Sequence, residues 1–142
     1  MYKLIYKKLS INEISYINRK EFSADGTEKK FYNFLKSSMS KYGIKDPVYI
    51  EYGSESYGDI LKIIVGNNRV AMTHQLGIKE IPYIIKNFKA DTYNIEGTVL
   101  NTDEEIKKYF YLPDQLQIRR DKDNNIDQIM PPWYIEVKDK YV

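Results

Sequence analysis

The sequence contains no cysteine, and its 142 residues include a single histidine, His74. Without thiols, the chain cannot form disulfides, Cys-based zinc sites, iron–sulfur clusters or a thiol nucleophile. One histidine excludes a His-rich metal site, and a Ser-His-Asp triad could form only around His74. Carboxylates therefore remain as the side chains best able to act as a general acid or base.

Long apolar runs are also missing, since no stretch approaches the roughly 20 residues that a membrane-spanning helix needs. The N-terminus lacks the apolar core of a signal peptide. We therefore expect no membrane insertion or secretion and place the protein in the cytoplasm. The formal net charge of +2 is too small for bulk electrostatic coating of nucleic acid. With 42% hydrophobic and 30% charged residues, the composition is that of a folded globular chain.

Local patterns in the first part of the chain predict strands over 2–6, 48–52, 60–65 and 81–85, and helices over about 27–42 and 69–76. Asp25 or Thr27 is suited to cap the first helix, and Gly43 stands where that helix should end. The apolar run Ile60–Val65 predicts a central strand that is buried on both faces.

The pattern changes after Phe88. Thr102 is followed three residues later by Glu105, the spacing of a capping box at a helix start. A polar turn separates 116–120 from 126–130, which predicts a hairpin, and a last strand is expected over 133–137. We therefore expect an α+β fold: a small mixed sheet with packed helices over 1–88, and a short C-terminal α/β extension, 89–142, packed on it as one domain.

The segment Gly66-Asn67-Asn68-Arg69 lies between a strand and a short helix. A glycine at such a junction lets the backbone approach a ligand closely, and a helix N-terminus offers free N–H groups and partial positive charge. Arg69 adds a forked donor suited to phosphate oxygens. As an isolated pattern, Gly-x-x-Arg is also compatible with an ordinary turn and a surface arginine.

Several separated motifs agree in order and spacing with one superfamily over residues 10–88. They are Asn18-Arg19-Lys20-Glu21-Phe22, Leu35, Ser38, Gly43-Ile44-Lys45-Asp46-Pro47-Val48, Gly66-Asn67-Asn68-Arg69, Leu76-Gly77-Ile78 and Ile81-Pro82. In this arrangement the chain resembles the ParB/sulfiredoxin-like superfamily, whose domains are also described as ParB-like nuclease domains. The resemblance implies a nucleotide site whose phosphates rest on the Gly-x-x-Arg turn.

The chain departs from that family at positions that matter for function. Ala71 and Met72 stand where partition proteins carry a further arginine and an alanine, and Asp46 replaces a glutamine linked to nucleotide hydrolysis. Asn67 stands where sulfiredoxins carry their cysteine, which excludes cysteine-sulfinic acid reduction. The downstream helix-turn-helix of partition proteins is not found in 89–142, so a chromosome-segregation clamp is not expected.

The resemblance implies two groups of site residues. Gly66, Asn67, Asn68, Arg69 and Arg19 would bind the phosphates of a nucleoside triphosphate with Mg²⁺. Asp46 is placed at the pocket edge and Glu28 at the start of the first helix, and these two carboxylates are the catalytic candidates. An acid in the first helical turn also serves simply to complement the helix dipole, so that reading of Glu28 stays open.

Other polar clusters have simpler interpretations. The run Asp121–Asn125 starts like a calcium loop, but Ile126 and Pro132 occupy positions that require glycine and glutamate, so a polar hairpin turn is expected. His74 lies on the expected second helix without a partner histidine or cysteine, which favours a structural role. Arg119, Arg120 and Lys122 form a small basic cluster that could contact nucleic acid, although nearby acids offset its charge.

Two functions are consistent with the sequence. The first is a ParB-like nucleotide- or phosphate-binding protein, with a Mg²⁺-dependent NTPase or phosphotransferase as its enzymatic form. The alternative is a catalytically silent binding module of a phage or other mobile element that contacts DNA or a host protein. Loss of the flanking arginine and glutamine favours the second function, whereas the presence of Gly66 and Arg69 favours the first.

Overall fold

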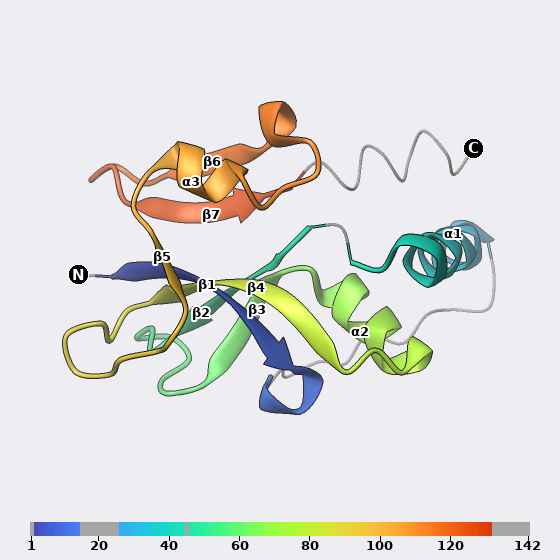
Figure 1. Cartoon of the computed structure of the whole chain (residues 1–142), viewed down its shortest axis with the longest axis horizontal. Coiled ribbons are helices and arrows are strands. Elements are labelled where there is room, and N and C mark those ends of the chain that lie inside the picture. The colour runs from blue at the N-terminus through green and yellow to red at the C-terminus, as the bar shows by residue number, and fades with distance from the viewer. Residues whose placement is uncertain (1, 15–25, 45, 132–142) are drawn as a thin grey trace.

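The computed structural model describes residues 2–14, 26–44 and 46–131. These residues form a mixed α+β fold, as the sequence predicts (Figure 1). The strands are β1 (Lys3–Ser10), β2 (Val48–Tyr52), β3 (Leu61–Val65), β4 (Glu80–Asn87), β5 (Thr98–Leu100), β6 (Gln117–Arg120) and β7 (Ile126–Met130). The α-helices are α1 (Gly26–Tyr42), α2 (Asn67–Leu76) and α3 (Asp103–Lys107), and short 3-10 turns cover Ile11–Glu13 and Pro113–Gln115.

Five strands form one sheet in the order β3-β2-β4-β1-β5. Neighbouring strands are antiparallel except β2 and β4. These two are parallel because β3 runs back alongside β2, and β4 then begins, after α2, at the end of the sheet where β3 ends. The fifth strand, β5, comes from the region after residue 88 and pairs with β1. The extension therefore adds a strand to the sheet as well as packing on it.

Each face of the sheet has its own hydrophobic core. Alternating residues of β4 show this, because Ile84 packs in the cluster beneath α3 and the β6–β7 hairpin, and Ile85 packs in the cluster that includes Val70 of α2. Figure 1 shows the hairpin and α3 on one side of the sheet and α2 on the other. Helix α1 packs against α2 in a third cluster that joins Leu35 and Met72. The core thus extends from α1 to the hairpin.

The expected position of the Ile60–Val65 strand was wrong. β3 lies at an edge of the sheet, and only Ile63 of its five residues is buried. The central strand is β4, whose residues from Tyr83 to Asn87 are all buried. An apolar run indicates that both faces of a strand contact other elements. β3 fits this in part, because Ile64 and Val65 pack against the cluster beneath the hairpin. The run does not indicate how many strands pair beside β3.

Several local predictions are confirmed. Gly43 and Gly77 both have positive φ and follow the last residues of α1 and α2. The Thr102 side chain accepts a hydrogen bond from the Glu105 N–H and caps α3. In the β6–β7 turn, the Asp121 carboxylate accepts from the N–H groups of Asp123 and Asn125, both at 2.9 Å.

Some predictions fall elsewhere in the chain or find no counterpart. Pro82 sits inside β4 rather than at its beginning, opposite Lys8 of β1. The last strand, expected over 133–137, and the cap at Asp25 lie outside the described residues. No helix among the described residues is long and apolar enough to cross a bilayer.

Candidate functional site

The junction between β3 and α2 is built on Gly66. Its φ of 114° lies in the left-handed region, and its carbonyl accepts the first helical hydrogen bond from the Val70 N–H at 3.0 Å. A Cβ atom at this position would lie 3.0 Å from a methyl group of Val48 and 3.0 Å from Nη2 of Arg69. The turn therefore requires glycine both for its backbone conformation and for its close packing.

The first N–H groups of α2 have no side-chain cap. Asn67 is exposed at the first position of the helix, and Asn68 beside it is half-buried. Within the described part of the chain, the buried Oδ1 of Asn68 has no hydrogen-bond partner. The turn thus combines the positively polarised N-terminus of α2 with an amide oxygen, Oδ1 of Asn68, that lacks a hydrogen-bond partner among the described residues.

Arg69 points into the protein. Its side chain is 4% exposed, and Nη1 donates to the main-chain carbonyl of Asp46. Both terminal nitrogens also lie 3.5 Å from the carbonyl oxygen of Pro47. Burial lowers the pKa of Arg69 to about 10, although the nearby Asp46 opposes that shift. The guanidinium therefore fixes the loop before β2, and the phosphate-binding role that the resemblance implies for it stays a prediction.

Asp46 joins three parts of the molecule. It is 2% exposed, and its Oδ1 accepts a hydrogen bond of 2.8 Å from the main-chain N–H of Tyr111, which follows α3. Its carbonyl accepts from Arg69 of α2. The Asp46 carboxylate thus connects the loop before β2 to the extension, and a catalytic role for it stays a prediction.

A hollow of about 560 Å³ lies beside this loop. Its lining residues come from β1, the C-terminal end of α1, the loop before β2, the start of β4 and the segment after α3: Tyr6, Lys8, Met39, Ser40, Gly43, Ile44, Pro47, Ile78, Glu80, Pro82 and Tyr109. The motif residues Gly43, Ile44 and Pro47 therefore lie at a concave surface. The sequence did not single out Tyr6 and Tyr109, because they are far apart in the chain.

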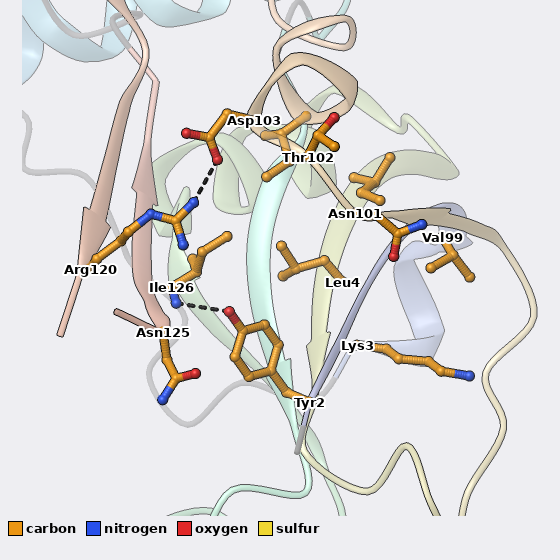
Figure 2. Close-up of a pocket in the computed structure, with 12 residues that line it drawn as sticks. Tyr2, Lys3, Leu4, Val99, Asn101, Thr102, Asp103, Arg120, Asn125 and Ile126 are labelled. Carbon is orange, nitrogen blue, oxygen red and sulfur yellow. Dashed lines mark hydrogen bonds and ion pairs between the residues drawn. The ribbon is translucent and has the colours of Figure 1, made fainter. Parts of the chain in front are cut away.

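Two further hollows lie at the interface of the sheet with the extension. The smaller, of about 290 Å³, is drawn in Figure 2 between β1, the start of α3 and the hairpin turn. At its rim, Arg120 and Asp103 form an ion pair of 2.6 Å, and the Tyr2 hydroxyl accepts from the Ile126 N–H at 2.8 Å. The ion pair therefore ties α3 to the hairpin within the extension, and the Tyr2 hydrogen bond ties the hairpin to the segment before β1.

The other hollow, of about 600 Å³, contains Glu51 and Asp127 in its lining. Lys86 pairs in register with Glu51 on the neighbouring strand and is 6% exposed. The Lys86 ammonium donates to the Ile126 carbonyl and lies 4.9 Å and 4.7 Å from the ring centroids of Tyr2 and Phe88. Burial raises the pKa of Glu51; the charge of Lys86 opposes this shift and that of Asp127 adds to it. The opposite charge of Lys86 on the adjacent strand therefore offsets the effect of burial on the Glu51 pKa only in part.

The remaining candidate residues are placed as follows. Arg19 lies outside the described residues, and Glu28 is the third residue of α1. In the basic cluster, Arg120 is paired with Asp103, and Arg119 donates to the Gln128 side chain at 3.3 Å. His74 lies in the last turn of α2 and is half-buried. The structure thus ties two of the three basic residues to hairpin or helix partners.

In the described part of the chain, the side chains do not form a metal site by themselves. No group of three or more His, Cys, Asp or Glu side chains there could hold a metal ion. Asp46, the carboxylate nearest the turn in the sequence argument, already accepts from Tyr111. Mg²⁺ usually binds through one or two carboxylates together with substrate phosphates. The residues present therefore do not fit a resident Mg²⁺ site, and a metal would have to arrive with the nucleotide.

No family model and no curated protein matches the chain. Similar solved structures are ParB proteins and a free serine kinase. The chromosome-partitioning protein ParB from Caulobacter crescentus, complexed with CTP-γ-S, is 12% identical with a TM-score of 0.44, covering 78% of this chain and 52% of that one.

Two other structures give similar values. A Pnob8-like ParB-N domain is 13% identical with a TM-score of 0.43, covering 77% of this chain and 36% of that one. A free serine kinase in complex with AMP is 18% identical with a TM-score of 0.43, covering 85% and 48%. The chain spans about half the length of these proteins or less.

Proposed function

We propose that the protein binds a nucleotide through its phosphates at the N-terminus of α2. The observation that carries the proposal is the left-handed Gly66, which begins a helix whose first N–H groups have no side-chain cap and whose first residue, Asn67, is exposed. Helix ends of this kind attract anions because their N–H groups and dipole both favour negative charge. The partnerless Oδ1 of Asn68 gives the same turn an acceptor for a ligand hydroxyl or amino group. The motif resemblance supports the same location.

A substitution at Asn67 tests this proposal with little disturbance of the fold. Asn67 is exposed, so Asn67→Asp places a negative charge at the helix end without altering the core. The change should stabilise the helix slightly and repel phosphate. We expect calorimetric titration with ATP, CTP, GTP and UTP, and with tripolyphosphate, to show at least a tenfold loss of affinity for the tightest ligand. Asn67→Ser is the matched neutral control and should bind more tightly than Asn67→Asp. If Asn67→Asp binds as tightly as Asn67→Ser, the phosphates bind elsewhere.

The enzymatic form of the proposal is a Mg²⁺-dependent NTPase or phosphotransferase with Asp46 or Glu28 as the acid or base. Asp46→Asn is a suitable test, because the amide oxygen can still accept from the Tyr111 N–H. We expect this variant, assayed with a panel of hydroxyl acceptors, to lose turnover but to retain nucleotide binding. Glu28→Gln is the second candidate. Turnover that survives both substitutions would exclude these residues, and the absence of turnover in the wild type would favour the silent binding module.

A further inference from the structure

The hollow of about 560 Å³ and the Gly66–Arg69 turn share one short stretch of backbone. Pro47 lines the hollow, and its carbonyl oxygen lies 3.5 Å from both terminal nitrogens of Arg69. The next residue, Val48, packs against the Cα of Gly66 closely enough to exclude a side chain there. The loop before β2 therefore contacts both the hollow and the Gly66–Arg69 turn.

Two tyrosines give the hollow an aromatic wall. The rings of Tyr6 and Tyr109 lie 3.9 Å apart between centroids and are inclined by only 14°. Tyr6 belongs to β1, whereas Tyr109 follows α3 in the extension. Buried Pro47 and Met39 also line the hollow, so a flat ring placed there would meet both aromatic and aliphatic surfaces.

The rim of the hollow is polar. Lys8, Ser40 and Glu80 all line it and are all exposed. They supply an ammonium donor, a hydroxyl group and a carboxylate acceptor around one aromatic wall. This combination suits a heteroaromatic ring with donors and acceptors at its edge better than a hydrocarbon ring. The volume lies within the range of about 300–1,000 Å³ that is typical of small-molecule sites.

We propose that this hollow binds the planar base of the nucleotide, and that Tyr109 lets the extension form part of the binding site. The inference rests on the proposed phosphate site for its nucleotide, but its own evidence is the aromatic wall and the polar rim. Stacking of a base on an aromatic side chain is favourable for every base, because each base has a π face. The hollow therefore sets the class of ligand and not the identity of the base.

Calorimetric titration of the full chain tests this with three probes: the tightest-binding nucleoside triphosphate, tripolyphosphate, and the corresponding nucleoside. Tyr109→Ser should weaken triphosphate binding at least about fivefold and leave tripolyphosphate binding unchanged. Tyr109→Phe keeps the ring and should bind the triphosphate more tightly than Tyr109→Ser. Tyr93→Ser is the control, since Tyr93 is exposed in the loop between β4 and β5.

The outcomes separate the two proposals. If Tyr109→Ser binds the nucleoside triphosphate as tightly as the wild type, the base site is wrong and the phosphate site stands. If tripolyphosphate does not bind but the nucleoside binds in a Tyr109-dependent way, the phosphate site is wrong and the hollow stands. If the wild type binds none of the three probes, both the phosphate site and the base site are wrong. If Tyr109→Ser does not fold, Tyr6→Leu removes the other ring of the pair and gives the same comparison.

Discussion

Buried polar side chains in this protein are used to hold loops in place. Arg69 donates to two main-chain carbonyls, and Asp46 accepts from the main chain after α3. Because buried charges are costly unless they are hydrogen-bonded, each of these side chains requires its partners. Tyr49 differs from both, since its buried hydroxyl has no partner among the described residues. We therefore expect substitutions of Arg69 and of Tyr49 to change the free energy of unfolding in opposite directions.

Arg69→Ala should lower the free energy of unfolding by about 1.5–3 kcal/mol, because it leaves buried carbonyl oxygens without donors. Chemical denaturation measures this directly. Arg119→Ala is the matched control, because Arg119 is exposed and its side chain donates to the Gln128 side chain at 3.3 Å and not to a buried carbonyl. If both variants were equally stable, the buried guanidinium would not be holding the loop before β2.

Tyr49→Phe should raise the free energy of unfolding by about 1–3 kcal/mol at neutral pH, since it removes a buried hydroxyl without a partner. Burial, with smaller effects of Glu51 and Asp127, also raises the pKa of Tyr49 above its ordinary value of 10. A folded-state pKa above the unfolded one contributes stability below pH 10, and that contribution is lost as the pH rises further.

The alkaline unfolding of the wild type should therefore begin above about pH 10 and should begin at a higher pH in Tyr49→Phe. Circular dichroism against pH would show the difference. Tyr93→Phe provides the comparison, because Tyr93 is exposed and should follow the wild-type curve. Identical alkaline midpoints for Tyr49→Phe and the wild type would show that Tyr49 ionises freely.

At the scale of elements, the junction between β3 and α2 is the most constrained part of the candidate site. Both backbone conformation and packing limit position 66, whereas most other turns are limited by conformation alone. Gly58 is a useful comparison, because it has φ of 69° and open space where a Cβ would lie. The two glycines differ mainly in what surrounds them.

Gly66→Ala should cost more stability than Gly58→Ala. Both changes introduce strain of roughly 1 kcal/mol or more at positive φ. Only the change at Gly66 also forces a methyl group to 3.0 Å from Val48. Thermal unfolding of both variants would measure the difference, and equal losses would mean that Val48 moves aside without cost.

At the scale of the whole molecule, the extension is continuous with the core. Leu100 of β5, Ile106 of α3 and Ile129 of β7 share one cluster with Tyr49 and Ile84 of the sheet. A chain that buries one cluster from both regions is expected to unfold cooperatively. The prediction is then that the division at residue 88 marks the end of the motif resemblance and that the chain folds as one domain.

Calorimetry of the full chain should therefore show one unfolding transition with equal calorimetric and van't Hoff enthalpies. A chain ending at Phe88 should lose this transition, because the cluster around Tyr49 and Ile84 would be exposed. Two separate transitions in the full chain would contradict the single-domain prediction.

Binding to duplex DNA should be weak and should fall steeply with salt. The net charge is +2, and Arg120 of the basic cluster is already paired with Asp103. Binding of this kind rests on electrostatic contacts with the phosphate backbone, and added salt competes with those contacts. Fluorescence anisotropy with a labelled duplex at two salt concentrations measures this. Tight, sequence-selective binding at physiological salt would instead favour the DNA-contacting module.

The sequence by itself determined most local structure. Period-2 and helical patterns placed β2 and α1, and Gly43, Gly77 and Thr102 marked helix ends, because capping and turn conformation depend on a few neighbouring residues. The glycine at position 66 also indicated the break between β3 and α2.

Tertiary structure alone decided how these parts meet. It placed β3 at the sheet edge, turned Arg69 towards the carbonyls of Asp46 and Pro47, and stacked Tyr6 on Tyr109. Each of these results depends on residues far apart in the chain, so no local pattern contains it. Strand order and buried polar contacts are set by which faces pack together, and that choice belongs to the whole fold.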